Sequence, residues 1–494
     1  MPRKPGLEVI TPRWRGLAVA FGFGAVMALG QAPLGFWWAT LGALAGLIWW
    51  VGRAEAGAFW LGLFGGAGYF ALALSWIVEP FLIDAATFGW MAPFALVLLS
   101  FGLALFWGVA AAVSAGARHR AIGFAVALAA GEMLRGYMLT GFPWAQIGHV
   151  WIGMPVDQVA AYLGPNGLTL ITVLAAALPV VMGWRGAGLA VAGLALVAGA
   201  GMARLAGPLP ADRDVTLRLV QPNAEQHLKW DPDLAQTHFD RLLALTRTEP
   251  VADLTIWPET AVPYLFEYSP EVAPMITEAS GGRPVITGIQ RAEGERFYNS
   301  LRVIERDGQE MARYDKSHLV PFGEYIPFGD LLGAWFGVTA FASQAGNTYT
   351  AGAGPAVLNL GRFGKVLPLI CYEAVFPQDV NAAPERADWI LQITNDAWFG
   401  VWTGPFQHAA QARLRAVEQG LPLVRVANTG LTEVVNARGR VVTALQFGTI
   451  GALDAVLPGA LPPTIYARFG EGPVLVLLAC LGLVTLRRRR PMAH

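Results

Sequence analysis

Charged residues are scarce in this sequence of 494 residues. Asp, Glu, Lys and Arg together make up 14% of the chain, whereas soluble globular proteins carry about 25%. The deficit lies in residues 14–205 and in the last apolar run, while residues 206–471 have the composition of a soluble domain. The formal net charge is +0 and no basic patch with interleaved aromatic residues is present, so nucleic-acid binding is not predicted.

Cysteine is equally scarce, with only 2 residues, Cys371 and Cys480. Cys480 lies within the last apolar run, where we expect lipid around it, so the two cysteines are not expected to form a disulfide. The 7 histidines are scattered without the spacing of metal ligands. No glycine-rich phosphate-binding loop is present either. The sequence therefore predicts no metal and no other cofactor.

Long apolar runs of roughly 20 residues predict membrane-spanning helices. We expect about eight spans, near residues 16–31, 35–52, 57–78, 90–116, 121–139, 166–184, 187–205 and 472–486. Their many glycines predict close packing between helices. The sequence thus divides into a membrane domain of seven transmembrane helices (1–205), a water-facing domain (206–471), and a C-terminal transmembrane helix with a basic tail (472–494).

The basic residues predict the orientation of these spans. In an eight-span arrangement the clusters of Lys and Arg all fall on one side, which the positive-inside rule makes cytoplasmic. These residues are Arg3, Lys4, Arg13, Arg15, Arg53, Arg118, Arg120, Arg185 and Arg487, Arg488, Arg489, Arg490. Residues 206–471 are then extracytoplasmic. One span more or fewer before residue 206 would reverse that orientation.

Glu132 and Arg135 are unusual because they lie at the end of the fifth expected span. Charged residues inside a span are costly and often functional. Their i, i+3 spacing on a helix also allows them to neutralise each other. The spacing favours a structural ion pair, and a functional role is the alternative.

Short apolar runs alternate with amphipathic stretches in residues 206–471, which predicts an α/β domain. The expected strands are 215–221, 254–257, 284–289, 300–304, 366–370, 389–394 and 423–427. The expected helices are 234–248, 270–279 and 406–419. Strands this apolar are expected to be covered on both faces, by helices or by a second sheet.

Three polar residues, Glu259, Lys316 and Cys371, stand at the ends of such strands, where α/β proteins usually place their ligands. A carboxylate can take the proton of a thiol nucleophile, and a lysine can stabilise the oxyanion that forms when the thiol attacks a carbonyl. These residue types therefore indicate acyl transfer. Taken singly, a buried core cysteine, a turn carboxylate and a solvated lysine are the alternatives.

Three motifs contain these residues, in order: Trp-Pro-Glu-Thr at 257–260, Tyr-Asp-Lys-Ser-His-Leu-Val-Pro-Phe-Gly-Glu-Tyr-Ile-Pro at 314–327, and Ile-Cys-Tyr-Glu at 370–373. Together they resemble the nitrilase, or carbon–nitrogen hydrolase, superfamily. The resemblance is closer to its membrane members, the apolipoprotein N-acyltransferases. It covers nearly the whole chain, including residues 134–146, and implies an αββα sandwich for residues 206–471.

By that resemblance, Glu259 is the general base, Lys316 the oxyanion-stabilising cation and Cys371 the nucleophile. Glu324 matches a second acidic position that orients Lys316, and the backbone N–H of Tyr372 would be the second oxyanion donor.

Two further residues, Glu373 and Trp230, match positions that the family uses around the site. Packing or hydrogen bonding is an equal alternative for each of them.

The resemblance further implies an activity, its substrates and a location. An acyl group would pass from a phospholipid, chiefly phosphatidylethanolamine, through a Cys371 thioester to the N-terminal diacylglyceryl-cysteine of an apolipoprotein. The protein would then be a multi-pass protein of the bacterial inner membrane with its catalytic domain on the periplasmic side. Two alternatives are a membrane-tethered amidase or nitrilase acting on small amides, and a transporter carrying a degenerate nitrilase-like domain.

Overall fold

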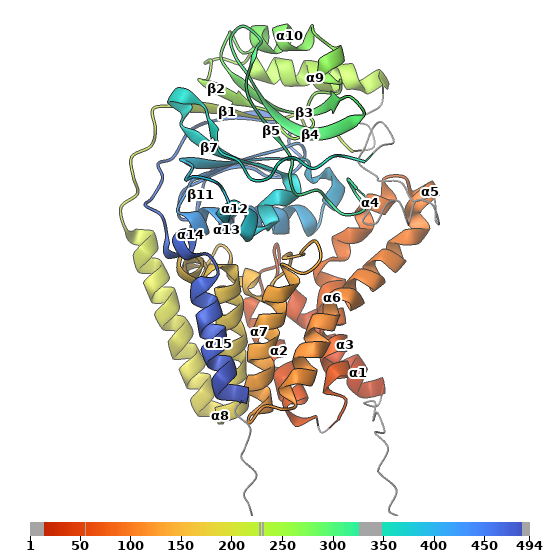
Figure 1. Ribbon diagram of the computed structural model, residues 1–494, viewed down its shortest axis with the longest axis vertical. Coiled ribbons are helices and arrows are strands. Elements are labelled where there is room, and N and C mark those ends of the chain that lie inside the picture. Colours follow the sequence, from red (N-terminus) through yellow and green to blue (C-terminus); the bar gives the residue numbers. More distant parts are fainter. Residues whose placement is uncertain (1–13, 55, 227–228, 230–231, 326–347, 487–494) are drawn as a thin grey trace, which may run out of the picture. The chain divides into compact units, whose positions relative to one another are not determined.

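A computed structural model describes residues 14–54, 56–226, 229, 232–325 and 348–486 (Figure 1). The chain forms two compact units, which divide between Gly207 and Pro208 and again between Ala467 and Arg468. The first unit contains both chain termini and is helical, and the second, Pro208–Ala467, contains all of the described strands.

The long helices of the first unit overlap the expected spans. They are α1 (Trp14–Ala28), α2 (Trp37–Arg53), α3 (Ala58–Ala73), α6 (Ala92–Ser114), α7 (Arg120–Arg135), α8 (Ala160–Ala206) and α15 (Gly472–Leu486). The short helices α4 (Glu79–Leu82), α5 (Ala85–Phe88) and, at the boundary, α14 (Ile465–Phe469) lie outside those spans. Between α7 and α8, the chain forms two short 3-10 helices, Ile147–Trp151 and Pro155–Val159.

The number of membrane crossings is not confirmed by helix length and hydropathy. Within the described residues, Ala85–Ser114 and Pro155–Ala206 are long and apolar enough to cross a membrane. A third span results if Ala58–Ala73 and Ser75–Leu82, bent by 65°, are counted together. The helices α1, α2 and α15 fall short because they contain only 15, 17 and 15 residues.

Two expected spans, 166–184 and 187–205, lie in the single segment α8. The segment is broken at Gly183, whose φ of 57° and ψ of −138° are not helical. The break therefore falls at the end of the first of these expected spans, two residues before Arg185.

Close helix packing in this unit depends on glycine, as predicted. A Cβ atom on Gly24 of α1 would lie 1.8 Å from the carbonyl oxygen of Gly65 on α3. Any larger residue at Gly24 would therefore push these two helices apart, which is how small residues act between membrane helices.

Glu132 and Arg135 form a fully buried ion pair on α7, with 2.8 Å between Glu132 Oε2 and Arg135 Nη2. Trp107 Nε1 donates to Glu132 Oε1 at 2.8 Å. Arg135 also donates to the carbonyl oxygens of Phe142 and Trp144. These contacts support the structural interpretation of the pair.

The second unit contains two six-stranded sheets. The first sheet has the order β12-β1-β2-β3-β4-β5 and the second β11-β10-β9-β8-β7-β6. The strands are β1 (Thr216–Gln221), β2 (Leu254–Ile256), β3 (Val285–Glu293), β4 (Arg296–Ile304), β5 (Glu310–Asp315), β6 (Leu358–Asn359), β7 (Lys365–Ile370), β8 (Trp389–Thr394), β9 (Leu423–Ala427), β10 (Thr432–Val435), β11 (Val441–Leu445) and β12 (Gly451–Val456).

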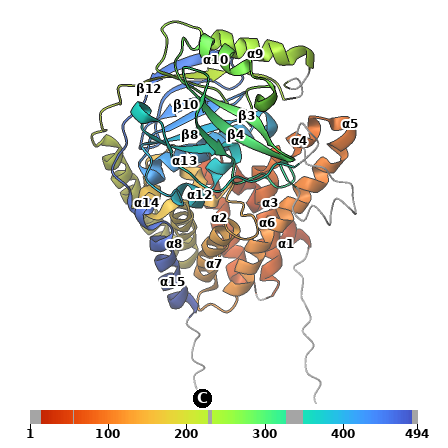
Figure 2. The same ribbon diagram turned by 45° about the horizontal axis from the view of Figure 1, so that its top comes forward.

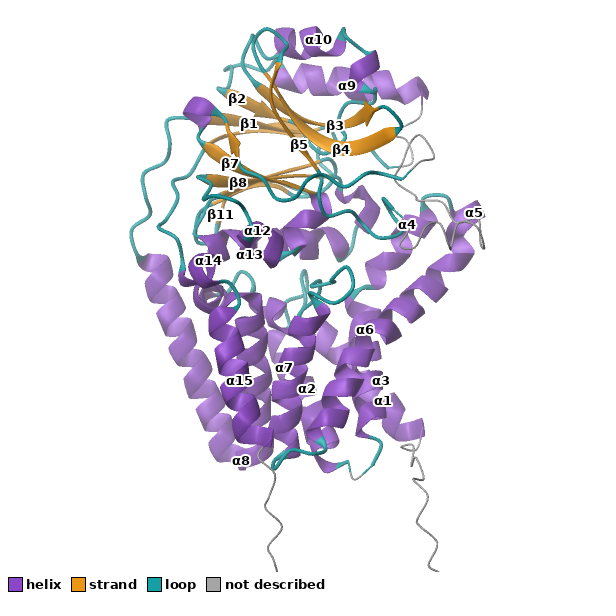
Figure 3. Cartoon of the chain, viewed as in Figure 1, coloured by secondary structure: helices purple, strands orange, loops and turns teal. Residues whose placement is uncertain are grey.

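Helices cover the outer face of each sheet, which gives an αββα sandwich (Figures 1 and 3). The helices α9 (Pro232–Thr246) and α10 (Val272–Ala279) lie over the first sheet, and α12 (Pro377–Asn381) and α13 (Gly404–Gln419) lie over the second. When the top of the molecule is turned forward, the two sheets overlap in the view (Figure 2). The layered α/β prediction is confirmed.

The central strands β7, β8 and β9 pair in parallel and are almost wholly buried. This explains why they read as continuous apolar runs rather than as alternating patterns.

All seven expected strands and all three expected helices are present, but five strands were not predicted. β11 and β12 are half-exposed, and Asp454 interrupts β12, so neither is buried as a central strand is. β6 contains only 2 residues. β5 alternates between exposed and half-buried positions over most of its length.

Candidate active site

Glu259, Lys316 and Cys371 come together from the ends of three strands in two sheets. Glu259 follows β2 and Lys316 follows β5, both in the first sheet, whereas Cys371 follows β7 in the second. All three are buried, with 6%, 1% and 5% of their surfaces exposed. The charges of Glu259 and Lys316 both act on the Cys371 thiol.

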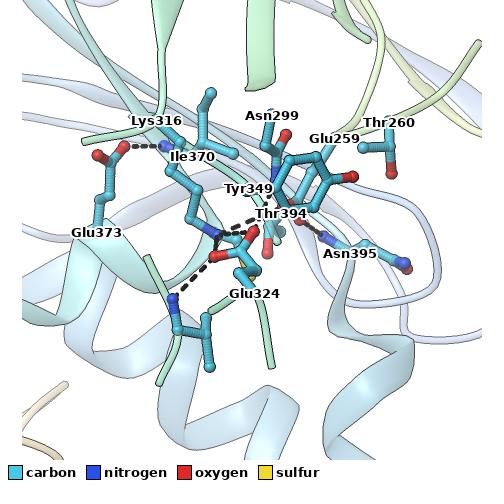
Figure 4. Close-up of polar contacts among 12 residues, drawn as sticks. Glu259, Thr260, Asn299, Lys316, Glu324, Tyr349, Ile370, Glu373, Thr394 and Asn395 are labelled. Atoms are coloured by element: carbon cyan, nitrogen blue, oxygen red, sulfur yellow. Dashed lines mark hydrogen bonds and ion pairs between the residues drawn. The ribbon is translucent and has the colours of Figure 1, made fainter. Parts of the chain in front are cut away.

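The Glu259 carboxylate is held from both sheets (Figure 4). Asn299 Nδ2, on β4, donates to Glu259 Oε1 at 2.7 Å. The backbone N–H of Asn395, just after β8, donates to Glu259 Oε2 at 2.8 Å. Lys316 Nζ lies 3.7 Å from Glu259 Oε1. Both carboxylate oxygens are thus fixed in a direction set by the fold.

Lys316 pairs most closely with Glu324, as the sequence predicted for that residue. Lys316 Nζ lies 2.9 Å from each oxygen of Glu324. Val320 N–H and Asn299 Nδ2 also donate to this carboxylate, at 2.8 and 3.0 Å. Burial alone lowers the pKa of Lys316, but the charges of Glu324 and Glu259 outweigh it and raise that pKa above its ordinary value. The ammonium therefore stays charged.

Cys371 begins a 3-10 turn with a φ of 52°, in the left-handed region that residues other than glycine seldom adopt. Burial raises the pKa of its thiol, and the Glu259 charge raises it further. Lys316 and a hydrogen bond with Thr394 oppose that rise only in part. At neutral pH the group is therefore a thiol, which needs a base before it can attack.

Glu373 ties the segment after Lys316 to the turn at Cys371. Its Oε1 accepts from Tyr314 Oη and Ser317 N, both at 2.7 Å, from Ser317 Oγ at 2.9 Å and from His318 N at 3.1 Å. Its Oε2 accepts from Ile370 N at 2.7 Å (Figure 4). Burial raises the pKa of Glu373, and these hydrogen bonds oppose that rise. The contacts fit the hydrogen-bonding alternative for this residue.

The two remaining residues named from the sequence are Tyr372 and Trp230. The Tyr372 ring packs edge-on against Phe376 and His318, with ring centroids 4.9 and 5.8 Å apart. His318 itself bonds Asp379 through Nδ1 at 2.7 Å. Trp230 lies outside the described residues.

Lys229 belongs to this cluster and was missed by the sequence reasoning. Its Nζ donates to Thr260 Oγ1 at 2.8 Å and to the carbonyl oxygen of Glu259 at 3.2 Å. Burial lowers the pKa of Lys229 to about 8, although the charges of Glu259 and Cys371 act in the opposite direction. Its segment has neither an apolar run nor a polar residue at a strand end, so no pattern pointed to it.

Asn299 was missed because β5 was not predicted as a strand. In the sheet, β4 pairs with β5 so that Ser300 lies opposite Asp315. This register brings Asn299 next to Lys316, whose N–H donates to the Asn299 carbonyl at 2.8 Å. The β4–β5 register, which places Asn299 beside Lys316, is the signal that would have identified Asn299.

Gly288 on β3 makes room for the turn that bears Glu259. A Cβ atom on Gly288 would lie 2.6 Å from Glu259 Cα and 2.5 Å from Thr260 N. A side chain there would therefore displace the carboxylate from its position between the two sheets.

The cluster combines a protonated thiol, a fixed carboxylate and a lasting positive charge in a site closed to bulk water. Such a set can activate a nucleophile and stabilise a tetrahedral oxyanion. Within the described ranges, no three His, Cys, Asp or Glu side chains are grouped as metal ligands. The chemistry that these side chains can supply is acyl transfer or hydrolysis.

Comparison with known proteins agrees with this fold and extends it. Residues 216–461 match the family model for carbon-nitrogen hydrolases, so the second unit has the fold of that class. A solved amidase of this superfamily from Nesterenkonia, 18% identical, matches with a TM-score of 0.39, covering 55% of this chain and 99% of the amidase chain.

The first unit carries the more specific match. Residues 23–178 match the model for the N-terminal domain of apolipoprotein N-acyltransferase. The apolipoprotein N-acyltransferase of Caulobacter vibrioides is 40% identical, over 96% of this chain and 95% of its own. That of Bradyrhizobium diazoefficiens is 37% identical, over 98% and 97%. The chain belongs to the apolipoprotein N-acyltransferase family and is an acyltransferase.

Proposed function

We propose that this enzyme transfers an acyl chain from a phospholipid, with phosphatidylethanolamine as the main donor, to the N-terminal amine of a diacylglyceryl-cysteine apolipoprotein. The observation that carries the proposal is the buried cluster in which Glu259, Lys316 and Cys371 meet. Full-length similarity to named apolipoprotein N-acyltransferases supports the substrate class.

The first half-reaction loads the enzyme. Cys371 Sγ attacks the ester carbonyl while Glu259 takes the thiol proton, which is required because the pKa of the thiol is raised. Lys316 and the N–H of Tyr372 stabilise the oxyanion. The ester C–O bond then breaks, Glu259 returns the proton to the departing lysophospholipid alkoxide, and a Cys371 thioester is left.

The second half-reaction transfers the chain. The acceptor amine attacks the thioester carbonyl, Glu259 takes the amine proton, and the C–S bond breaks. The proton then returns to the Cys371 thiolate, so the enzyme regains its starting state. The order is ping-pong. In both halves Glu324 keeps Lys316 in place, through contacts of 2.9 Å.

The decisive experiment uses the full chain in the Cys480→Ser background, since Cys480 is an exposed thiol. We expect label from phosphatidylethanolamine with a labelled acyl chain to appear on Cys371, as found by mass spectrometry. Neutral hydroxylamine should remove it. A diacylglyceryl peptide with a free N-terminal amine should accept it, and the same peptide N-acetylated should not.

Two results would overturn the proposal. Label that persists in a hydroxylamine-sensitive bond after Cys371→Ser, in a chain that then has no cysteine, would show that the labile acyl bond is not a Cys371 thioester. No label on a folded chain that hydrolyses simple amides would indicate a membrane-tethered amidase instead.

We further propose that residues 1–205 form a membrane domain of seven transmembrane helices, that 472–494 add an eighth, and that residues 206–471 are the catalytic domain on the periplasmic side of the bacterial inner membrane. The one-sided distribution of Lys and Arg supports this orientation. In the Cys480→Ser background, Tyr268→Cys should react with an impermeant maleimide in spheroplasts, and Arg118→Cys only after lysis. Both positions are exposed. The reverse pattern would place the catalytic domain in the cytoplasm.

A further inference from the structure

A second buried cluster of charged side chains lies behind the nucleophile and has no part in the proposed acid–base steps. It consists of Asp396, which follows β8, His408 on α13 and Arg425 on β9. The side chains of all three are completely buried. Burying three ionisable groups costs free energy unless they are paired and hydrogen-bonded. The partners of each group therefore decide whether its burial is tolerated.

Asp396 binds both cations. Its Oδ1 lies 2.8 Å from His408 Nδ1 and accepts from Thr394 Oγ1 at 3.0 Å. Its Oδ2 accepts from Arg425 Nη2 at 2.6 Å. Burial raises the pKa of Asp396, but Arg425 and His408 more than reverse this and hold it well below its usual range. Asp396 is therefore an ionised acceptor.

The other edge of the His408 ring faces the backbone of the nucleophile. His408 Nε2 lies 3.0 Å from the carbonyl oxygen of Cys371, and Gln392 Nε2 donates to the same oxygen at 3.0 Å. A carbonyl oxygen only accepts, and it has two lone pairs. His408 Nε2 and Gln392 Nε2 lie 3.1 Å apart, so the two nitrogens converge on this one oxygen.

His408 has the Asp396 carboxylate at Nδ1 and the Cys371 carbonyl at Nε2, while Arg425 Nη2 and Gln392 Nε2 lie 3.3 and 3.1 Å from these nitrogens. The shorter contacts, at 2.8 and 3.0 Å, are those with the two acceptors, so the geometry favours a proton on each nitrogen, which is the imidazolium form. With Arg425, two positive charges then share the single negative charge of Asp396. The cluster has a net positive charge directly behind the peptide that joins Cys371 to Tyr372.

We infer that His408 is a positioning residue of the oxyanion hole: held by Asp396, it polarises and fixes the Cys371–Tyr372 peptide so that the Tyr372 N–H becomes a stronger donor. The carbonyl that His408 binds and the N–H of Tyr372 belong to one peptide unit, and hydrogen bonds in such a chain strengthen one another. The two donors also hold the carbonyl of a residue whose φ is 52°. The inference rests on the proposed acyl transfer.

A matched pair of variants tests the inference in the Cys480→Ser background. His408→Gln can keep a neutral donor at the position of Nε2, whereas His408→Asn can keep only the bond to Asp396. Either change leaves Asp396 paired with Arg425, so no single charge is left buried. We expect His408→Asn to slow single-turnover acylation of Cys371 about 10- to 100-fold and His408→Gln to slow it less, because the loss of a direct oxyanion donor costs about 100- to 1,000-fold.

Alkylation of Cys371 by iodoacetamide is the control, because it forms no oxyanion. We expect its rate to stay within about twofold of the parent in both variants, since neither removes Glu259 or Lys316. If acylation and alkylation fall together, His408 supports the thiol itself and the inference is wrong. If neither falls, His408 has no part in the reaction.

Nitrogen-15 NMR of the full chain labelled at histidine provides a second readout that does not depend on acyl transfer. We expect both ring nitrogens of His408 to be protonated at pH 7, with the signal assigned by its loss in His408→Gln. A neutral ring would overturn the inference. Failure of the proposed function would look different, since the parent chain itself would then take up no label from phosphatidylethanolamine.

Discussion

Each unit of the chain buries a glutamate beside a cation, and the two pairs differ in what surrounds them. On α7, Glu132 meets Arg135 at 2.8 Å. Both side chains have further hydrogen-bond partners: Trp107 donates to the carboxylate, and Arg135 donates to two backbone carbonyls. One negative charge balances one positive charge, and the described contacts of the carboxylate involve no thiol.

In the second unit, Lys316 lies between two carboxylates, and a second ammonium, Lys229, bonds the backbone of Glu259. Lys316 lies 2.9 Å from Glu324 and 3.7 Å from Glu259. The second carboxylate, Glu259, acts on a thiol whose pKa it helps to raise. In the part of the chain that the structure describes, no thiol contacts the α7 pair, whereas Glu259 acts on a protonated thiol and can serve as its base. The contrast gives a structural criterion for telling the two kinds of buried pair apart.

The largest effect on acyl transfer is expected from Glu259→Gln, which removes the carboxylate charge but keeps the shape of the side chain. Loss of a general base should lower the rate of acyl-enzyme formation about a thousandfold. The same change should lower the pKa of the Cys371 thiol, because the Glu259 charge raises it. Alkylation by iodoacetamide at pH 8 should therefore become faster while acylation by phospholipid nearly stops.

This opposite response distinguishes a base from a packing residue. A Glu259→Gln chain that lost both reactivities in parallel would have a displaced Cys371. A chain that kept more than a tenth of its acylation rate would have its base elsewhere.

Glu324→Gln should have a smaller effect, since it leaves the base and the nucleophile in place. Glu324 is the closer carboxylate of Lys316 and raises its pKa more than Glu259 does. Without it, we expect Lys316 to be less well held and kcat to fall about 10- to 100-fold. Glu324→Asp should recover part of that loss. An unchanged kcat in Glu324→Gln would show that Lys316 needs only Glu259.

The sequence was sufficient for the parts of the site that lie in contiguous motifs. Glu259, Lys316, Glu324 and Cys371 each stand in a short run that could be recognised without any structure. The central strands were equally predictable, because full burial on both faces requires an unbroken apolar run. A half-exposed strand such as β11 is not required to be apolar on both faces. Its sequence therefore predicts a strand less clearly.

The residues that were missed depend on tertiary contacts. Asn299 reaches Glu259 only through the register of β4 with β5, and Asn395 does so only because β8 of one sheet ends opposite β2 of the other. His408 lies 37 residues from Cys371 along the chain, yet its ring meets the Cys371 carbonyl. Each of these pairs is set by packing between elements, which local patterns do not record.

Lys229→Met should change stability more than acyl transfer. Burial lowers the pKa of Lys229 from 10.5 to about 8, so the unfolded chain binds more protons between pH 8 and pH 10.5. The free energy of unfolding that this group contributes therefore rises with pH across that window, by about 3 kcal/mol in all. Below pH 8 the cost of burying the ammonium is fully present.

The melting temperatures of the parent and of Lys229→Met provide the measurement. The melting temperature of the parent should rise relative to that of the variant between pH 8 and pH 10. Below pH 7, the difference between the two melting temperatures should not change with pH. A difference that does not depend on pH would mean that Lys229 is equally protonated in both states.

The smallest effect on acyl transfer is expected at the balanced pair. Glu132→Gln leaves Arg135 buried beside a neutral amide, which should lower the free energy of unfolding by about 3–5 kcal/mol. The joint change Glu132→Leu with Arg135→Leu should recover most of it, because an apolar pair of similar volume avoids the cost of burying charge. Recovery should be incomplete, since the carbonyls of Phe142 and Trp144 lose their donor.

Acylation per folded chain should be unchanged in both variants, in contrast to Glu259→Gln. Thermal unfolding in detergent, followed on the same samples as single-turnover acylation, separates the two quantities. If Glu132→Gln slowed acylation with no change in unfolding, the α7 pair would be functional, and the presence of a thiol would not distinguish a structural from a reactive buried pair. A melting-temperature loss with intact acylation would instead support the criterion, because only the cluster that includes the thiol would then control the chemistry.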